Sequence, residues 1–360
     1  MKQQHQVDVL VVGLGPAGSV AATEAARAGL SVMAIDRKQQ VGVPVQCAEY
    51  IPLPIGQYAQ AAGVLQQAIS GMTSRLPSGA KTQSALPGLM IDPTAFDQAL
   101  AQQAADHGVE VCCEARLVQV DAPQQLAEVK TPSTEMCVHY RLLIAADGPH
   151  SSVAASLQLA PLDSVFTRQY TVPLLQPLTD TQVWLSGDFP GGYAWLFPKG
   201  SVANLGAGAD KRWTHDIKQP LESLHQELVA QGWVGREVLK LTGGLIPVGG
   251  LRPSLHVGHI LFAGDAAGLT DPITGAGIAA ALASGELAGA AAARYLLRQQ
   301  ADALTEYEQE IRERYTPSLQ RALQRRAQFE AAGGKLLGDA QYRQTWIAYP
   351  EYFQTQAASA

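Results

Sequence analysis

A glycine-rich turn near the N-terminus limits the fold of this chain more than any other feature. Gly13-Leu14-Gly15-Pro16-Ala17-Gly18 separates the apolar run 7–12, a predicted buried strand, from a predicted helix over 16–28. A second strand is expected over 30–35, and Asp36 follows it 23 residues after Gly13. Such glycines let backbone amides approach a pyrophosphate, and a carboxylate at this distance can bind the adenosine ribose. The sequence therefore predicts a Rossmann-type dinucleotide site containing Gly13, Gly15, Ala17, Gly18, Asp36 and Arg37.

Two later strand ends indicate which dinucleotide is bound. The apolar run 143–146 ends in Asp147-Gly148, and the run 260–263 ends in Gly264-Asp265 followed by small residues. These segments resemble the Asp-Gly and Gly-Asp motifs of the two-domain flavoproteins typified by aromatic hydroxylases. The resemblance implies FAD as cofactor, with Asp265 binding the ribityl chain and Asp147 and Gly264 in the same cofactor site.

A second glycine-rich segment follows the Gly-Asp motif. Asp271-Pro272-Ile273-Thr274-Gly275-Ala276-Gly277 opens a long, Ala-rich helix expected to end near 298. Free amides at a helix start favour negative charge, which accumulates at the pyrimidine edge of a flavin when it is reduced. We therefore expect Pro272, Gly275, Ala276 and Gly277 to border the flavin.

The order of the predicted elements indicates an α/β chain in which a substrate domain interrupts the cofactor domain. Asp92-Pro93 starts a helix, and strands over 109–120 and 137–146 return to the first domain. Short strand-like runs with one amphipathic stretch fill 164–250, whereas 41–90 has an irregular pattern. The expected divisions are a Rossmann-type FAD-binding domain over 1–48, 92–163 and 251–300, an interleaved antiparallel-sheet substrate domain over 49–91 and 164–250, and a C-terminal helical segment over 301–360.

The most specific pattern lies in the expected substrate sheet. Tyr193-Ala194-Trp195-Leu196-Phe197-Pro198 precedes Gly206-Ala207-Gly208 by seven residues, and an earlier segment contains Pro44-Val45-Gln46-Cys47. Both segments resemble the geranylgeranyl reductase family, and the resemblance covers about 7–298. It implies that Cys47 is a catalytic residue near the flavin and that Tyr193, Trp195 and Phe197 contact the substrate. The three aromatic residues share one face of a strand, a spacing that also fits core packing.

Two reactions fit this resemblance. In the first, reduced FAD delivers a hydride to an isoprenoid double bond and Cys47 supplies the proton. In the second, a monooxygenase modifies a tryptophan of a partner oxidase during maturation of a tryptophylquinone cofactor. Ala48-Glu49-Tyr50 lacks the glycines that many of the reductases have after the cysteine, and the chain is short for enclosing a prenyl tail. Both reactions therefore stay open, beside a third hypothesis of a flavin-retaining binding module without turnover.

Composition narrows the list of partners. The formal charge of −6 is spread without a basic stripe, so nucleic acid is not an expected partner. The four cysteines have no CxxC spacing and the histidines have no metal-ligand spacing, so neither a metal site nor a disulfide framework is expected. No signal peptide or transmembrane segment is predicted, which favours the cytoplasm. Since a second nucleotide motif is lacking, NAD(P)H is expected to dock only transiently as reductant.

Overall fold

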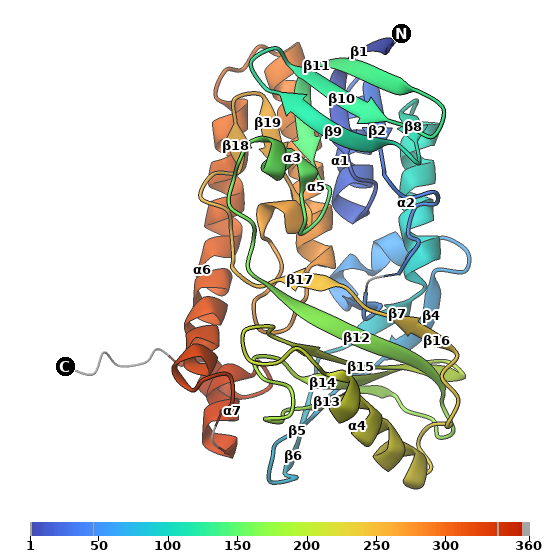
Figure 1. Cartoon of the computed structure of the whole chain (residues 1–360), viewed down its shortest axis with the longest axis vertical. Coiled ribbons are helices and arrows are strands. Elements are labelled where there is room, and N and C mark those ends of the chain that lie inside the picture. Colours follow the sequence, from blue (N-terminus) through green and yellow to red (C-terminus); the bar gives the residue numbers. More distant parts are fainter. Residues whose placement is uncertain (1, 46, 337, 355–360) are drawn as a thin grey trace, which may run out of the picture.

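The computed structural model describes residues 2–45, 47–336 and 338–354, and its first large sheet is built around the predicted βαβ unit (Figure 1). Strand β1 (Gln3–Val12) pairs in parallel with β2 (Val32–Ile35) and with β11 (Glu135–Ala145), while α1 (Pro16–Arg27) connects β1 to β2. Within the described residues the strand order is β18-β19-β11-β1-β2-β8, with β10 pairing with β11 and β9 pairing with β10. The remaining bounds are β8 (Glu110–Cys112), β9 (Arg116–Asp121), β10 (Leu126–Lys130), β18 (His256–Val257) and β19 (Ile260–Phe262).

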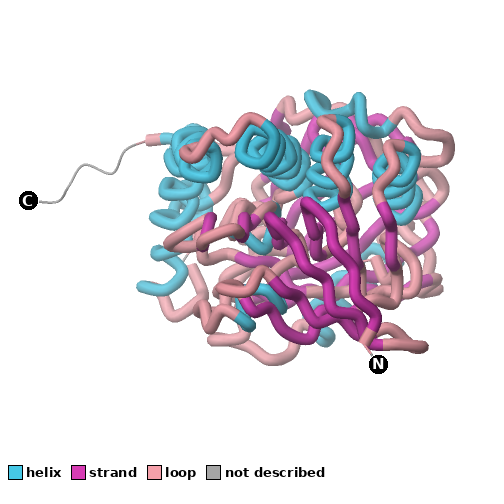
Figure 2. The backbone as a smooth tube through the Cα atoms, turned by 90° about the horizontal axis from the view of Figure 1, so that it is seen from above, coloured by secondary structure: helices cyan, strands magenta, loops and turns pink. Residues whose placement is uncertain are grey.

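Helices cover one face of this sheet, as the view from above shows (Figure 2). Helices α2 (Pro93–Asp106), α1, α5 (Ile278–Leu297) and α6 (Ala303–Ala331) pack side by side in that order. The α1–α5 contact is close because small residues form it. A Cβ atom added to Gly285 would lie 2.3 Å from the Ala17 carbonyl oxygen, and one added to Gly289 would lie 2.6 Å from that of Ala21. The Ala-rich sequence of α5 therefore serves a buried helix pair rather than a bilayer span.

The second large sheet lies below the first in Figure 1 and has one face covered by α4 (Lys218–Ala230). Its order is β16-β12-β15-β14-β13-β5-β6, with β17 also pairing with β12. The buried side chains of Leu221, Leu224 and Leu228 attach α4 to the sheet. This architecture confirms the predicted α/β fold with two interleaved layers. The strand bounds are β5 (Gly71–Arg75), β6 (Lys81–Ser84), β12 (Ser164–Pro173), β13 (Asp180–Trp184), β14 (Ala194–Lys199), β15 (Val202–Ala209), β16 (Lys240–Thr242) and β17 (Leu245–Pro247).

The segment expected to be irregular, 41–90, instead contributes several short strands. Strands β3 (Tyr50–Pro52), β7 (Gly88–Ile91) and β4 (Leu65–Ile69) form a small separate sheet beside the helical turn η1 (Leu53–Ala59). Strand β5 joins the second large sheet by pairing in parallel with β13. That sheet is consequently mixed rather than purely antiparallel. The domain limits given above remain a proposal.

The C-terminal segment closes the side of the second sheet. After α6, the short elements α7 (Asp339–Thr345) and η3 (Pro350–Phe353) place Trp346 and Tyr349 in one hydrophobic cluster with Trp195. Two further short helices, α3 (Ser152–Ser156) and η2 (Gly264–Ala267), follow strands of the first sheet. None of the described helices combines the length and apolarity that crossing a bilayer requires.

Candidate functional site

A cavity of about 580 Å³ lies between the two sheets and brings most of the predicted site residues together. Its lining includes Gly13, Gly15, Ala17, Asp36, Arg37, Cys47, Asp147, Tyr193, Trp195, Gly264, Asp265, Gly275 and Gly277. The other four predicted site residues, Gly18, Pro272, Ala276 and Phe197, are outside the lining formed by the described residues. Those four therefore support the cavity from behind or lie beside it.

The glycine-rich turn leaves open space where a pyrophosphate would need it. A Cβ added to Gly15 would meet no atom within 4 Å, whereas one added to Gly18 would lie 1.8 Å from the Gly13 carbonyl oxygen. Gly13 itself has a φ of +99°, which favours glycine. Asp36 accepts hydrogen bonds from the backbone amides of Leu14 and Lys38, both at 2.9 Å, which fixes the carboxylate at the edge of the turn.

Asp265 also lines the cavity. Its Oδ1 accepts a hydrogen bond from the Thr270 hydroxyl at 2.7 Å, and burial raises the pKa of its carboxyl group. A Cβ added to Gly277, at the start of α5, would lie 3.1 Å from the same oxygen. The buried carboxylate thus borders open space with acceptor capacity left over, which suits the hydroxyl groups of a ribityl chain.

Asp147 has a different local role. Its Oδ2 accepts hydrogen bonds from the Ser152 amide at 2.6 Å and the Ser152 hydroxyl at 2.8 Å, so it caps the start of α3. Its Oδ1 is buried and has no hydrogen-bond partner among the described residues. A buried oxygen without a partner is costly, so this atom is a candidate for a cofactor contact. Together with the open turn at Gly15, these observations fit FAD.

A row of aromatic side chains forms the cavity wall on the side of the second sheet. The Tyr193 hydroxyl donates to the Thr274 carbonyl at 2.5 Å, and the Tyr193 and Trp195 ring centroids are 5.7 Å apart. Gly206 lies beneath the Trp195 ring, since an added Cβ would be 2.3 Å from it. The indole N–H of Trp195 donates to Gln169 at 3.0 Å. This packing explains why the aromatic segment and the glycine segment occur together.

Phe197 belongs to the hydrophobic core of that wall. It is 8% exposed, and its ring centroid lies 6.1 Å from that of Tyr50 and 6.3 Å from that of Trp195. From the other side, Trp346 contacts Tyr193 with the ring centroids 4.8 Å apart. The C-terminal segment therefore completes the aromatic wall, a contribution that the sequence patterns did not indicate.

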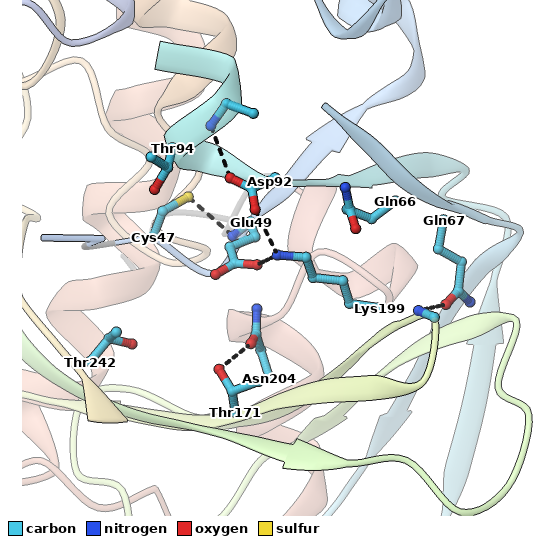
Figure 3. A network of polar contacts seen from close by, with 12 residues as sticks. Cys47, Glu49, Gln66, Gln67, Asp92, Thr94, Thr171, Lys199, Asn204 and Thr242 are labelled. Carbon is cyan, nitrogen blue, oxygen red and sulfur yellow. Dashed lines mark hydrogen bonds and ion pairs between the residues drawn. The ribbon is translucent and has the colours of Figure 1, made fainter. Parts of the chain in front are cut away.

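Cys47 borders the cavity and is held by two hydrogen bonds, of which Figure 3 shows the one with Glu49. Its Sγ accepts the backbone N–H of Glu49 at 3.1 Å, and its carbonyl accepts the Gln169 side-chain amide at 3.1 Å. Burial raises the pKa of the Cys47 thiol to about 12. The sulfur is therefore protonated at neutral pH, so it can donate a proton but is a poor nucleophile.

A buried ion pair stabilises the turn that carries Cys47 (Figure 3). Glu49 is 5% exposed and has a φ of +71°, which is uncommon for a residue with a side chain. Its Oε2 lies 2.6 Å from Nζ of Lys199, and the same ammonium lies 4.0 Å from Asp92. Lys199 follows Phe197 by two residues, so it is the next side chain on the aromatic face of β14.

The comparisons with known proteins agree with this site. Residues 8–144 match the family described as FAD dependent oxidoreductase, and residues 208–343 match the one described as Lycopene cyclase protein. Digeranylgeranylglycerophospholipid reductase of Methanocella arvoryzae is 31% identical over 89% of this chain and 86% of its own. The reductase 1 of that name from Methanopyrus kandleri is 35% identical over 79% and 80%. The chain belongs to the geranylgeranyl reductase family of FAD-dependent oxidoreductases.

Solved structures place this member of the geranylgeranyl reductase family among similar folds. A geranylgeranyl bacteriochlorophyll reductase-like protein of Thermoplasma acidophilum superposes with a TM-score of 0.85, at 27% identity, covering 96% of this chain and 92% of that one. The myxobacterial chondrochloren halogenase has a TM-score of 0.69 at 17% identity, over 92% and 84%, and shares the fold alone. The chain is an FAD-dependent oxidoreductase, and the tryptophylquinone alternative gains no support from these relatives.

Several residues of this reductase-family site were not singled out from the sequence. Gln169 bridges Trp195 and Cys47, while Lys199 and Glu49 pair across 150 positions. Of these residues, only Lys199 could have been indicated by the sequence, because the alternation of side chains along β14 puts it on the same face as Trp195. Asp97 also borders the cavity.

Asp97 leads to a prediction about pH and stability. Burial raises the pKa of Asp97 to about 7. The positive charge of Lys38 opposes this rise, and the negative charge of Asp36 adds to it. Because an unfolded carboxyl group has a pKa near 4, the unfolded chain loses this proton first, and Asp97 lowers the stability increasingly as the pH rises from about 4 to 7. Asp97→Asn should therefore stabilise the cofactor-free protein at pH 8 by about 1–2 kcal/mol. This free energy is smaller than the whole pKa shift would give, because solvent in the cavity screens the carboxylate.

Thermal unfolding at several pH values measures this effect. The advantage of Asp97→Asn should shrink as the pH falls toward 4. Asp106→Asn, an exposed position on the same helix, is the matched control and should change little. An advantage of Asp97→Asn that did not depend on pH would contradict the assignment.

Proposed function

We propose that this enzyme saturates isolated double bonds of an isoprenoid chain. The observation that carries the proposal is a neutral thiol, Cys47, on the same cavity as the aromatic wall of Tyr193 and Trp195 and the cofactor end at Asp265. The family membership supports it, since the curated relatives carry reductase names. We assign the cofactor-binding role to Gly13, Gly15, Ala17, Gly18, Asp36, Arg37, Asp147, Gly264, Asp265, Pro272, Gly275, Ala276 and Gly277.

The protein residues have separate tasks in this reaction. Reduced FAD, when bound, supplies a hydride. The aromatic wall excludes water and orients an apolar chain, and the Cys47 thiol holds the proton that the other carbon of the double bond receives. Two hydrogen bonds position the Cys47 sulfur. The Gln169 side-chain amide donates to the Cys47 backbone carbonyl, and the Glu49 backbone amide donates to Sγ itself. The double bond gains one hydride and one proton, and the thiolate regains its proton from solvent.

The proposed substrate is defined by its isoprenoid chain and not by the full length of the lipid. Tyr50 stands in the segment after Cys47 where many reductases have glycine, and its hydroxyl donates to the Leu86 carbonyl at 3.1 Å. Tyr50 also contacts Phe197, so its ring fills space beside the aromatic wall. A small hydrophobic substrate, or the isoprenoid chain of a larger lipid, fits this restriction. NAD(P)H as a transient reductant and a cytoplasmic location stay part of the proposal.

Anaerobic turnover tests the reaction. Holoenzyme reduced with dithionite should add two hydrogen atoms per double bond to geranylgeraniol or a geranylgeranylated lipid, as measured by mass spectrometry. Holoenzyme left oxidised is the control and should leave the substrate unchanged. Reducible FAD without saturation of any isoprenoid tested would contradict the proposal, and oxygen insertion into a tryptophan of a partner protein would favour the monooxygenase alternative.

A further inference from the structure

A second cavity of about 540 Å³ adjoins the one that contains Cys47. It lies between β12, β16 and the segment that leads into α4. Pro44, Val45, Thr167, Thr242 and Gly243 line both cavities. The two cavities therefore share a wall at the edge formed by β12 and β16.

Positive charge predominates in the second cavity, although the chain as a whole has a formal charge of −6. Its lining contains Arg168, Lys218 and Lys240 against one acidic residue, Asp216. Among the described residues Arg168 and Lys240 have no ion-pair partner, whereas Lys218 lies 3.6 Å from Glu222. The Nε of Arg168 donates to the Tyr170 hydroxyl at 3.1 Å, which leaves the two terminal nitrogens of the guanidinium for a ligand.

The rim of this cavity is apolar and exposed. Val43 and Leu241 line the cavity with 41% and 54% of their surface exposed, and Val238 and Leu239 beside them are 43% and 49% exposed. These four residues, the β16 rim, are four of the ten large apolar side chains that are exposed in the described residues. Strand β16 is the edge of its sheet, and Leu241 lies opposite Tyr170, on the face that bears Arg168.

We propose that the β16 rim docks on an anionic lipid bilayer and that the second cavity takes the phosphate headgroup of a lipid bound for the Cys47 cavity. The inference rests on the proposed function, because an isoprenoid lipid substrate resides in a membrane. Exposed leucine and valine side chains among cations have the composition of a surface that inserts at the headgroup level of anionic lipids. A second copy of this chain is a poorer partner, because it would bring the same cations to the contact.

Sedimentation with vesicles tests the docking surface. The FAD-bound protein should bind vesicles of phosphatidylcholine mixed with phosphatidylglycerol, bind phosphatidylcholine alone much less, and dissociate as salt is added. Val238→Ser/Leu239→Ser should weaken binding to the anionic vesicles by roughly 10-fold, because about half of each side chain would leave the bilayer. Leu297→Ser is the matched control, since Leu297 is 50% exposed at the far end of α5 and should bind like the parent.

The charges are tested separately from the apolar rim. Lys240→Glu should abolish the preference for anionic over neutral vesicles. Arg168→Ala should raise the KM for a geranylgeranylated phospholipid and leave the KM for uncharged geranylgeraniol unchanged. If Arg168→Ala instead weakens NADPH binding alone, the cavity serves the reductant and the lipid route is wrong.

Failure of this inference can be told apart from failure of the proposed function. Val238→Ser/Leu239→Ser should reduce geranylgeraniol free in solution at the parental rate, so docking and turnover are measured independently. Equal binding to neutral and anionic vesicles, no vesicle binding, or an unaffected rim variant overturns the docking surface. A holoenzyme dimer that the rim variant dissociates also overturns it, because the rim would then be an interface between two copies.

Discussion

Lys199→Met is expected to destabilise the protein by about 3–5 kcal/mol, because it leaves the Glu49 carboxylate buried without its counter-charge. The Glu49 side chain is 7% exposed and its oxygen lies 2.6 Å from the ammonium of Lys199. Removing one member of such a pair costs more than the pair contributes, since the remaining charge stays desolvated. Urea unfolding of the FAD-bound variant and parent measures the difference. Lys218→Met, which breaks an exposed pair with Glu222, should cost at most about 0.5 kcal/mol.

The double variant Lys199→Met/Glu49→Gln gives the control within the pair. It removes both charges and should recover most of the loss, because neither side chain then leaves an unpaired charge buried. Comparing Glu49→Gly with Glu49→Gln separates charge from backbone geometry, since both remove the charge but only glycine adopts the φ of +71° without strain. A Lys199→Met variant as stable as the parent would show that the pair is not a significant part of the fold.

The same pair is expected to position the thiol of Cys47. The Glu49 amide donates to Sγ, so a turn that relaxes from its left-handed conformation moves the sulfur or exposes it. The rate of Cys47 alkylation by iodoacetamide should therefore rise in Lys199→Met and fall back in the double variant. A purely structural role would lower stability in Lys199→Met but leave the alkylation rate of the folded protein unchanged.

Asp265→Ala is expected to lose FAD, while Cys47→Ala keeps it and loses double-bond saturation. Without the buried carboxylate, the ribityl hydroxyl groups lack an acceptor that water replaces poorly in an enclosed site. The expected penalty is about 1–3 kcal/mol, equivalent to roughly 5- to 150-fold weaker binding, with folding largely kept. Flavin absorbance after dialysis, combined with titration of FAD into the cofactor-free protein, measures the change.

Cys47→Ala is the matched comparison for Asp265→Ala. We assign Cys47 to the substrate side of the cavity, so its removal should leave the flavin spectrum intact and slow saturation by roughly 100-fold or more, the usual contribution of a positioned acid. The opposite pattern, with tight FAD binding in Asp265→Ala and a colourless Cys47→Ala, would show that the flavin is placed wrongly between these segments.

The predictions made from the sequence concern parts of the protein whose chemistry lies in contiguous residues. The glycine turn at 13–18, the carboxylate at Asp36 and the Gly-Asp strand end at Asp265 each combine a backbone conformation with a side chain a few positions away. Regular strands and helices of the first sheet follow from strong local periodicity, so α1, α2 and α5 lie close to their predicted limits. The alternation in β14 likewise predicted which side chains share a face.

Features that join distant segments become visible only in the folded structure. Strands β3 to β7 are short and partly polar, and their pairing with β13 and with one another gives no periodic signal in 41–90. The Lys199–Glu49 pair, the Gln169 bridge and the contact of Trp346 with Tyr193 span between 26 and 153 positions of the sequence. Such contacts exist only once burial and sheet pairing have brought their partners together, because an ion pair or a ring contact leaves no mark on the neighbouring sequence. The proposed cofactor residues could therefore be named from local sequence, whereas the setting of Cys47 and the charged second cavity could not.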